Sequence, residues 1–239
     1  MIKQSPAQFY MAQQRSLAEN KNHRLHATFN AVESSTPSID PFGALTLLND
    51  ETLAAGKYVE RTLTPGSIVM IIPIVGAAEC SFNDNEQIVI PGEAFTHHSP
   101  DGGTLTIKNP YDESLINFLY VSFSVTVISD VLQSNDFLIA KANLAERNHF
   151  HKLYESFQTG LSVQMSIFDG RAEIIHSMAN PTNGIFTFVI NGAFEVQGRL
   201  MESHDGLALW ETEEIEMEAL SDNAIMLLIE TPLIGFTAT

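Results

Sequence analysis

The chain has 239 residues, of which 44% are apolar and only 17% are charged. This composition supplies enough apolar side chain for one large or two small domains, and it excludes disorder along the whole chain. Acidic side chains outnumber basic ones by 29 to 12 and give a net charge of −17. Such a field opposes direct binding to nucleic acid and to anionic membrane surfaces.

Three features of the sequence bear on the cellular compartment of the protein: leader segments, membrane spans and cysteines. No stretch reaches the roughly 18 consecutive apolar residues of a membrane-spanning helix, and residues 1–30 lack the apolar core of a signal peptide. Cys80 is the single cysteine, so an internal disulfide and a cysteine-rich zinc site are both excluded. We therefore expect a cytoplasmic protein.

Short apolar runs separated by turn residues dominate the chain. Runs of about 4–8 residues at this spacing are typical of a β-sandwich or barrel. Asn191-Gly192, between two such runs, predicts a two-residue type I′ hairpin. The runs are Ser67–Val75, Thr104–Ile107, Ser114–Val127, Leu161–Phe168, Gly184–Ile190, Phe194–Val196, Gly206–Trp210, Glu214–Ala219 and Ala224–Ile229.

The segment 134–156 carries the best helix-like pattern, with apolar residues roughly one face apart in a polar background. It lies between two strand-rich halves. We therefore predict an N-terminal domain over residues 1–128, a partly helical connector over 129–158 and a C-terminal domain over 159–239.

A series of short motifs punctuates both halves. They are Pro41–Asp50, Val75–Glu79, Ile90–Glu93, Asn109–Tyr111, Phe168–Arg171, Phe188–Glu195 and His204–Leu209. In this order and spacing they resemble the pirin family of two-domain cupins, over nearly the whole chain. The resemblance implies an all-β fold of two jelly-roll barrels, a bicupin, with the functional site in the N-terminal barrel.

The resemblance also implies where a metal would be held. Metal-binding pirins use an H-x-H pair and a later H-x-E, because residues two apart on a strand face the same way and can point at one divalent, iron-type ion. In this chain those positions fall on Thr62 and Thr64, and on Thr104 and Thr106. Threonine hydroxyls are weak donors to such an ion, so we predict no metal cofactor at this site.

The four threonines have two interpretations. If Thr62, Thr64, Thr104 and Thr106 converge inside the barrel, their hydroxyls form a pocket for a neutral or weakly polar small molecule. Alternatively, threonine simply suits β-strands, and the pocket is filled by side chains or water.

The histidines and the cysteine give weaker indications of a functional site. His97-His98 follow Gly92 at roughly the distance of a second cupin motif and are secondary candidates for metal ligands, although adjacent strand residues face opposite sides and at most one enters the barrel. A turn or surface position is the other interpretation. Cys80 is expected to be buried and inert. No catalytic residue is assigned, since nucleophile and phosphate-loop motifs are missing.

The sequence therefore predicts a pirin-like bicupin without an intact metal site. It would bind a small molecule in the N-terminal barrel, or a protein partner, rather than act as an enzyme. The alternative is a quercetin 2,3-dioxygenase-type oxygenase, which would need iron or another divalent metal on non-standard ligands such as His97 or His98.

Overall fold

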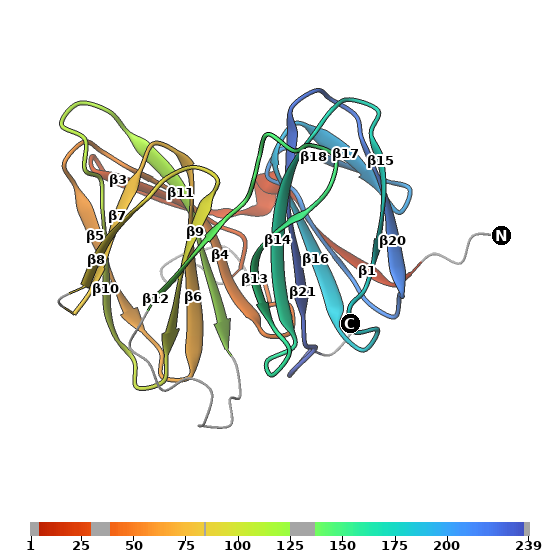
Figure 1. Cartoon of the computed structure of the whole chain (residues 1–239), viewed down its shortest axis with the longest axis horizontal. Coiled ribbons are helices and arrows are strands. Elements are labelled where there is room, and N and C mark those ends of the chain that lie inside the picture. The colour runs from red at the N-terminus through yellow and green to blue at the C-terminus, as the bar shows by residue number, and fades with distance from the viewer. Residues whose placement is uncertain (1–4, 30–38, 84, 125–136, 237–239) are drawn as a thin grey trace. The chain divides into compact units, whose positions relative to one another are not determined.

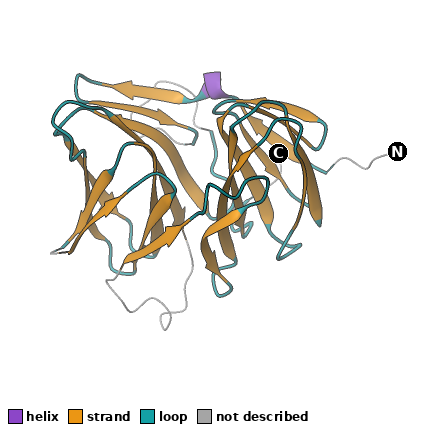
Figure 2. Ribbon diagram, turned by 45° about the horizontal axis from the view of Figure 1, so that its top comes forward, coloured by secondary structure: helices purple, strands orange, loops and turns teal. Residues whose placement is uncertain are grey.

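The computed structural model describes residues 5–29, 39–83, 85–124 and 137–236. These residues form strands and loops almost throughout (Figures 1 and 2), and their one helix is a 3-10 turn at Ala12–Gln14. No described helix has the length and apolar character needed to span a membrane. The strands divide into two compact units.

The N-terminal unit comprises residues 16–41 and 45–141. A seven-stranded antiparallel sheet has the order β12–β9–β6–β11–β4–β3–β2, and a four-stranded sheet has the order β5–β10–β7–β8. The strands are β2 (Ser16–Glu19), β3 (His23–Ala27), β4 (Leu45–Leu53), β5 (Tyr58–Leu63), β6 (Ser67–Val75), β7 (Ala78–Phe82), β8 (Asn85–Val89), β9 (Glu93–Ser99), β10 (Gly103–Lys108), β11 (Ile116–Ser124) and β12 (Phe137–Lys141).

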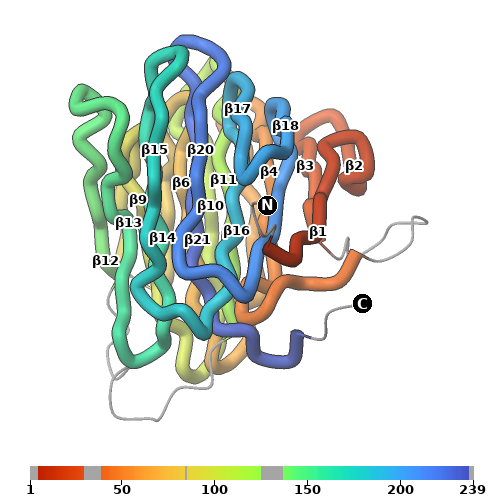
Figure 3. Tube along the Cα trace, turned by 90° about the vertical axis from the view of Figure 1, so that its right-hand side faces the viewer, coloured from red at the N-terminus to blue at the C-terminus, as the bar shows by residue number. Residues whose placement is uncertain are grey.

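The C-terminal unit comprises residues 1–15, 42–44 and 142–239. Its sheets have the orders β1–β19–β16–β21–β14–β13 and β15–β20–β17–β18, the latter seen side by side in Figure 3. The strands are β1 (Ala7–Tyr10), β13 (His151–Ser156), β14 (Leu161–Phe168), β15 (Glu173–Ser177), β16 (Gly184–Asn191), β17 (Ala193–Val196), β18 (Arg199–Glu202), β19 (Gly206–Leu209), β20 (Glu214–Ala219) and β21 (Ala224–Thr231).

The two units repeat one topology. Strands β4 to β11 of the N-terminal unit correspond in order and sheet position to β14 to β21 of the C-terminal unit. Each larger sheet gains a further edge strand, β12 in one unit and β1 in the other, on the same side of the order. Each unit closes over its own apolar core, contributed by both of its sheets. The predicted all-β, two-barrel fold is confirmed.

The predicted connector differs from expectation. Residues 129–136 lie outside the described residues, and the rest contains no helix: β12 pairs with β9, and β13 pairs with β14. The units divide at residues 141–142, and residues 1–15 join the C-terminal unit, where β1 pairs with β19. An edge strand has a weak pattern of its own, because its state is set by the strand with which it pairs.

The Asn191-Gly192 turn also differs from the predicted hairpin. Strand β17 begins at Ala193 but pairs with β18 and β20, in the opposite sheet from β16. Gly192 has a φ of 85°, and a Cβ on it would collide with the Ser221 hydroxyl. The turn is therefore a corner at which the chain changes sheets, and glycine is required there by conformation and by space.

Candidate functional site

Three of the four predicted pocket threonines, Thr62, Thr104 and Thr106, lie on the outer face of the four-stranded sheet, and Thr64 follows the end of β5. Thr62 on β5 is directly opposite Thr104 on β10. Thr62, Thr64 and Thr104 are exposed and Thr106 is half-buried, whereas the intervening Leu105 is buried. Since side chains alternate along a strand, these hydroxyls point away from the barrel interior. The expected threonine-lined pocket is corrected on this ground.

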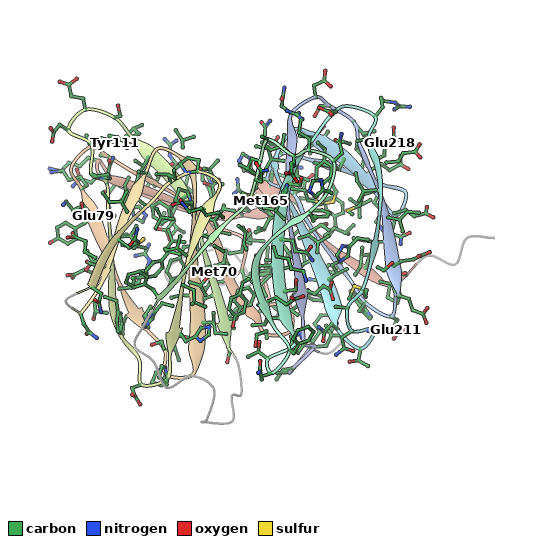
Figure 4. All side chains as sticks on the ribbon, in the orientation of Figure 1. Met70, Glu79, Tyr111, Met165, Glu211 and Glu218 are labelled. Atoms are coloured by element: carbon green, nitrogen blue, oxygen red, sulfur yellow. The ribbon has the colours of Figure 1, made fainter. Side chains whose placement is uncertain are left out.

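Neighbouring residues confirm that this face belongs to the surface. Thr106 is opposite Ser81 on β7, and Lys108 is opposite Glu79. The ammonium of Lys108 donates to Oε1 of Glu79 at 2.7 Å, and Glu79 lies at the outer side of its sheet in Figure 4. The threonines are part of a polar, solvated sheet face.

The inward positions are one residue away from the predicted ones. They are Val59, Arg61 and Leu63 on β5, and Leu105 and Ile107 on β10. Four of these side chains are aliphatic, and the guanidinium of Arg61 stays protonated and has no acceptor atom. This donor set does not fit a divalent iron-type ion. Within the described ranges, no three or more His, Cys, Asp or Glu side chains are grouped to hold a metal.

Arg61 belongs to a polar cluster inside the N-terminal barrel. Its Nη2 donates to Oε2 of Glu51 on β4 at 2.5 Å, and Nε2 of His23 on β3 lies 2.8 Å from the same oxygen. The other carboxylate oxygen, Oε1, accepts from Nδ2 of Asn49 at 3.4 Å. Glu51 is fully buried, while the side chains of Arg61 and His23 are 24% and 17% exposed. The cluster therefore links a buried carboxylate to solvent.

The charged groups of this cluster stabilise one another. Burial alone would raise the pKa of Glu51, but the hydrogen bond from His23 and the positive charge of Arg61 outweigh it and lower the pKa. The guanidinium of Arg61 also lies 5.7 Å from the ring centroid of Tyr120, and burial raises the pKa of that phenol to about 12. Glu51 is thus ionised and Tyr120 neutral at pH 7, beside a fixed positive charge.

Of the two adjacent histidines, His97 faces the barrel interior. It is fully buried, its ring centroid lies 4.0 Å from that of Phe82, and neither ring nitrogen has a hydrogen-bond partner. Burial, followed by the nearby His98, lowers the pKa of His97 to about 4. His97 is therefore neutral at pH 7. His98 is half-buried on the other side of β9, and burial lowers its pKa as well.

The C-terminal barrel holds a second buried carboxylate. Oε1 of Glu230 on β21 lies 2.9 Å from Nε2 of His176 on β15, and Oε2 accepts the backbone N–H of Ala179 at 3.0 Å. Both oxygens of Glu230 are engaged within the protein. The pair links the two sheets of the unit and fixes the start of the loop after β15.

Sequence reasoning did not single out Glu51, Arg61 or Glu230. A usable signal exists on β4, where Leu47, Asn49, Glu51 and Leu53 alternate with residues of the other face. A carboxylate at an inward position of such a strand must be paired. Its partners come from β3 and β5, however, and only the folded sheets bring them together. Cys80 is buried as expected, and burial raises the pKa of its thiol.

These two units, each a two-sheet β-sandwich with the same strand order, define the protein as a bicupin. Residues 158–231 match the family model Pirin_C_2, the quercetinase C-terminal cupin domain. No curated protein sequence matches the chain significantly. The matched segment and the two-barrel fold support the resemblance to the pirin family seen in the sequence.

Solved structures of low sequence identity share the fold. YhhW from Escherichia coli has a TM-score of 0.84 and 16% identity, covering 97% of this chain and 100% of YhhW. The nickel(II) complex of the same bacterial pirin has a TM-score of 0.82 and 15% identity, covering 96% of this chain and 100% of that structure's chain. A quercetin 2,3-dioxygenase from Acinetobacter baumannii has a TM-score of 0.71 and 17% identity, covering 95% of this chain and 79% of the dioxygenase chain.

Proposed function

We propose that this pirin-type bicupin works without a metal ion in its N-terminal barrel, as a cytoplasmic binding protein for a small molecule rather than as an oxygenase. The observation that carries this proposal is the register of β5 and β10. Their inward positions bear an arginine and four aliphatic side chains where the family's metal ligands are expected.

The electrostatics of the site support the same proposal. Oxygen chemistry at a metal needs an ion held with an open coordination position. The positive charge of Arg61 is balanced by the ionised, buried Glu51, so the pair has no net negative charge to attract a metal cation. Glu51 has its Oε2 committed to Arg61 and His23, so it is not a free ligand.

A quercetin 2,3-dioxygenase-type enzyme is the second candidate. The match of residues 158–231 to a quercetinase domain and the likeness to the A. baumannii enzyme favour it. On this account His97, whose two ring nitrogens have no hydrogen-bond partner, would be the first ligand to consider. It would need partners other than the side chains of β5 and β10.

Flavonol cleavage separates the two candidates. The full chain is assayed with quercetin after incubation with ferrous or nickel(II) ion, against the same metal in buffer without protein. The proposal expects no turnover above the metal-only control. Protein-dependent turnover that is lost in His97→Phe and kept in His98→Phe would establish the oxygenase instead.

A further inference from the structure

The buried imidazole of His97 breaks the pattern of the core around it. Its Cα partners are Val69 on β6 and Phe137 on β12, and the ring of Phe82 lies tilted against its own ring, with the centroids 4.0 Å apart. Ser99, two residues further along the same strand face, is also fully buried, and its hydroxyl has no hydrogen-bond partner. Three polar atoms on one side of β9 thus lack partners in an otherwise apolar environment.

An unpaired buried polar group is costly, and the few that occur in folded proteins need a reason. A leucine or phenylalanine would fill the position of His97 without that cost. Positions at which a chain departs from the rules of a packed core are often those that serve binding or catalysis. The departure at His97 therefore points to a ligand that completes its hydrogen bonds.

The chemistry of the ring selects the class of that ligand. A neutral imidazole offers one donor and one acceptor nitrogen, and a hydroxyl group can complement either of them. Ser99 offers the same pairing. A charged ligand would lose its hydration against Val69, Phe82 and Phe137 with no counter-charge among them. The surroundings therefore favour a molecule that is uncharged and mostly apolar.

We propose that the N-terminal barrel binds a small, uncharged, hydroxyl-bearing molecule, with the His97 ring as its polar anchor. This inference deepens the proposed function and rests on it, since it supplies the ligand class for metal-independent binding. Phe82 forms one wall of the site, and Ser99 is the second hydrogen-bonding group.

The test uses two probes that differ by one hydroxyl group, cyclopentanol and cyclopentane. Side-chain ¹⁵N resonances of the histidines are recorded on the full chain during titration with each. We expect cyclopentanol to shift the His97 nitrogens, to leave those of His149 unchanged and to bind about tenfold more tightly than cyclopentane, the effect of one hydrogen bond. His97→Phe should abolish this preference, and His98→Phe should keep it.

Equal binding of the two probes, or no shift at His97 with either, would overturn the inference. If His97→Phe does not fold, His97→Gln replaces it. An amide keeps one donor and one acceptor, so that variant should retain part of the preference, and its complete loss would count against hydrogen bonding as the cause. A protein that cleaves quercetin yet still prefers cyclopentanol at His97 would refute the proposed function and leave this site standing.

Discussion

Arg61 Nη2 lies 2.5 Å from Oε2 of Glu51, and this contact joins the four-stranded to the seven-stranded sheet inside the N-terminal barrel. Of the three residues that face inward from β5, Arg61 is thus a cation held by a buried carboxylate. In a metal-binding cupin the inward residues of this region are expected to supply ligands to a cation. Here the positive charge at this position belongs to the Arg61 side chain.

Removal of the guanidinium should expose how much this pair stabilises the unit. Arg61→Ala leaves Glu51 buried without its main counter-charge, and we expect a loss of about 3 kcal/mol, at the low end for a buried pair because Arg61 reaches solvent. Arg24→Ala is the matched control. It breaks an exposed pair with Glu19 and should cost less than about 1 kcal/mol. Urea unfolding at pH 7 measures both, and equal losses would contradict the assignment.

Acid should destabilise the protein through His97. The folded pKa of about 4 lies below the ordinary value of 6.5, so the unfolded chain binds a proton that the folded chain refuses. Stability is therefore lost as the pH falls from about 6.5 towards 4. His97→Phe should flatten this part of the profile and leave pH 7–8 unchanged in slope. An unaltered slope between pH 6.5 and 4 in that variant would show that the ring is not buried as described.

Because adjacent residues of β10 face opposite sides of the sheet, a lysine should affect stability very differently at the two positions. Thr104 faces solvent, so Thr104→Lys should change the free energy of unfolding by no more than about 0.5 kcal/mol. Leu105 is fully buried, and Leu105→Lys should cost more than about 4 kcal/mol because it buries an unpaired charge. Thermal melts of the two variants decide the register. The reverse order of effects would restore the threonine-lined interior.

Two glycines with similar backbone angles should differ in their tolerance of alanine. Gly43 and Gly56 have φ values of 58° and 63°, which cost an alanine about 1–2 kcal/mol each. A Cβ on Gly43 would also collide with the backbone carbonyl of Pro232, whereas nothing lies within 4 Å of a Cβ on Gly56. We expect Gly43→Ala to cost about 1–3 kcal/mol more. Denaturant midpoints compare them, and similar losses would contradict the close approach at Pro232.

The fold was predictable because turn residues divide the chain into short apolar runs, whereas the facing of β5 and β10 was missed by one residue. The family's H-x-H pattern, carried over to this chain, puts Thr62 and Thr64 inward. The alternation itself argues otherwise, since Leu105 and Ile107 are apolar and are separated by Thr106. Sheet faces follow the apolar residues, and that signal is stronger than a spacing counted across turns.

The polar cluster could not be read from the sequence for a different reason. Glu51 shows that a buried partner is needed, but His23 and Arg61 lie 28 and 10 residues from it along the chain. Nothing local selects them from the other charged residues. Strand pairing places β3 beside β4, and sandwich closure brings β5 to the same interior.

The metal content of the full chain shows directly whether the N-terminal barrel holds a metal ion. Tag-free protein is purified without chelator, incubated with ferrous ion, freed of unbound metal and analysed by elemental mass spectrometry. We expect far less than one metal per chain before and after incubation. A value near one metal per chain would contradict this expectation, and comparison with His97→Phe would then show whether His97 is among the ligands.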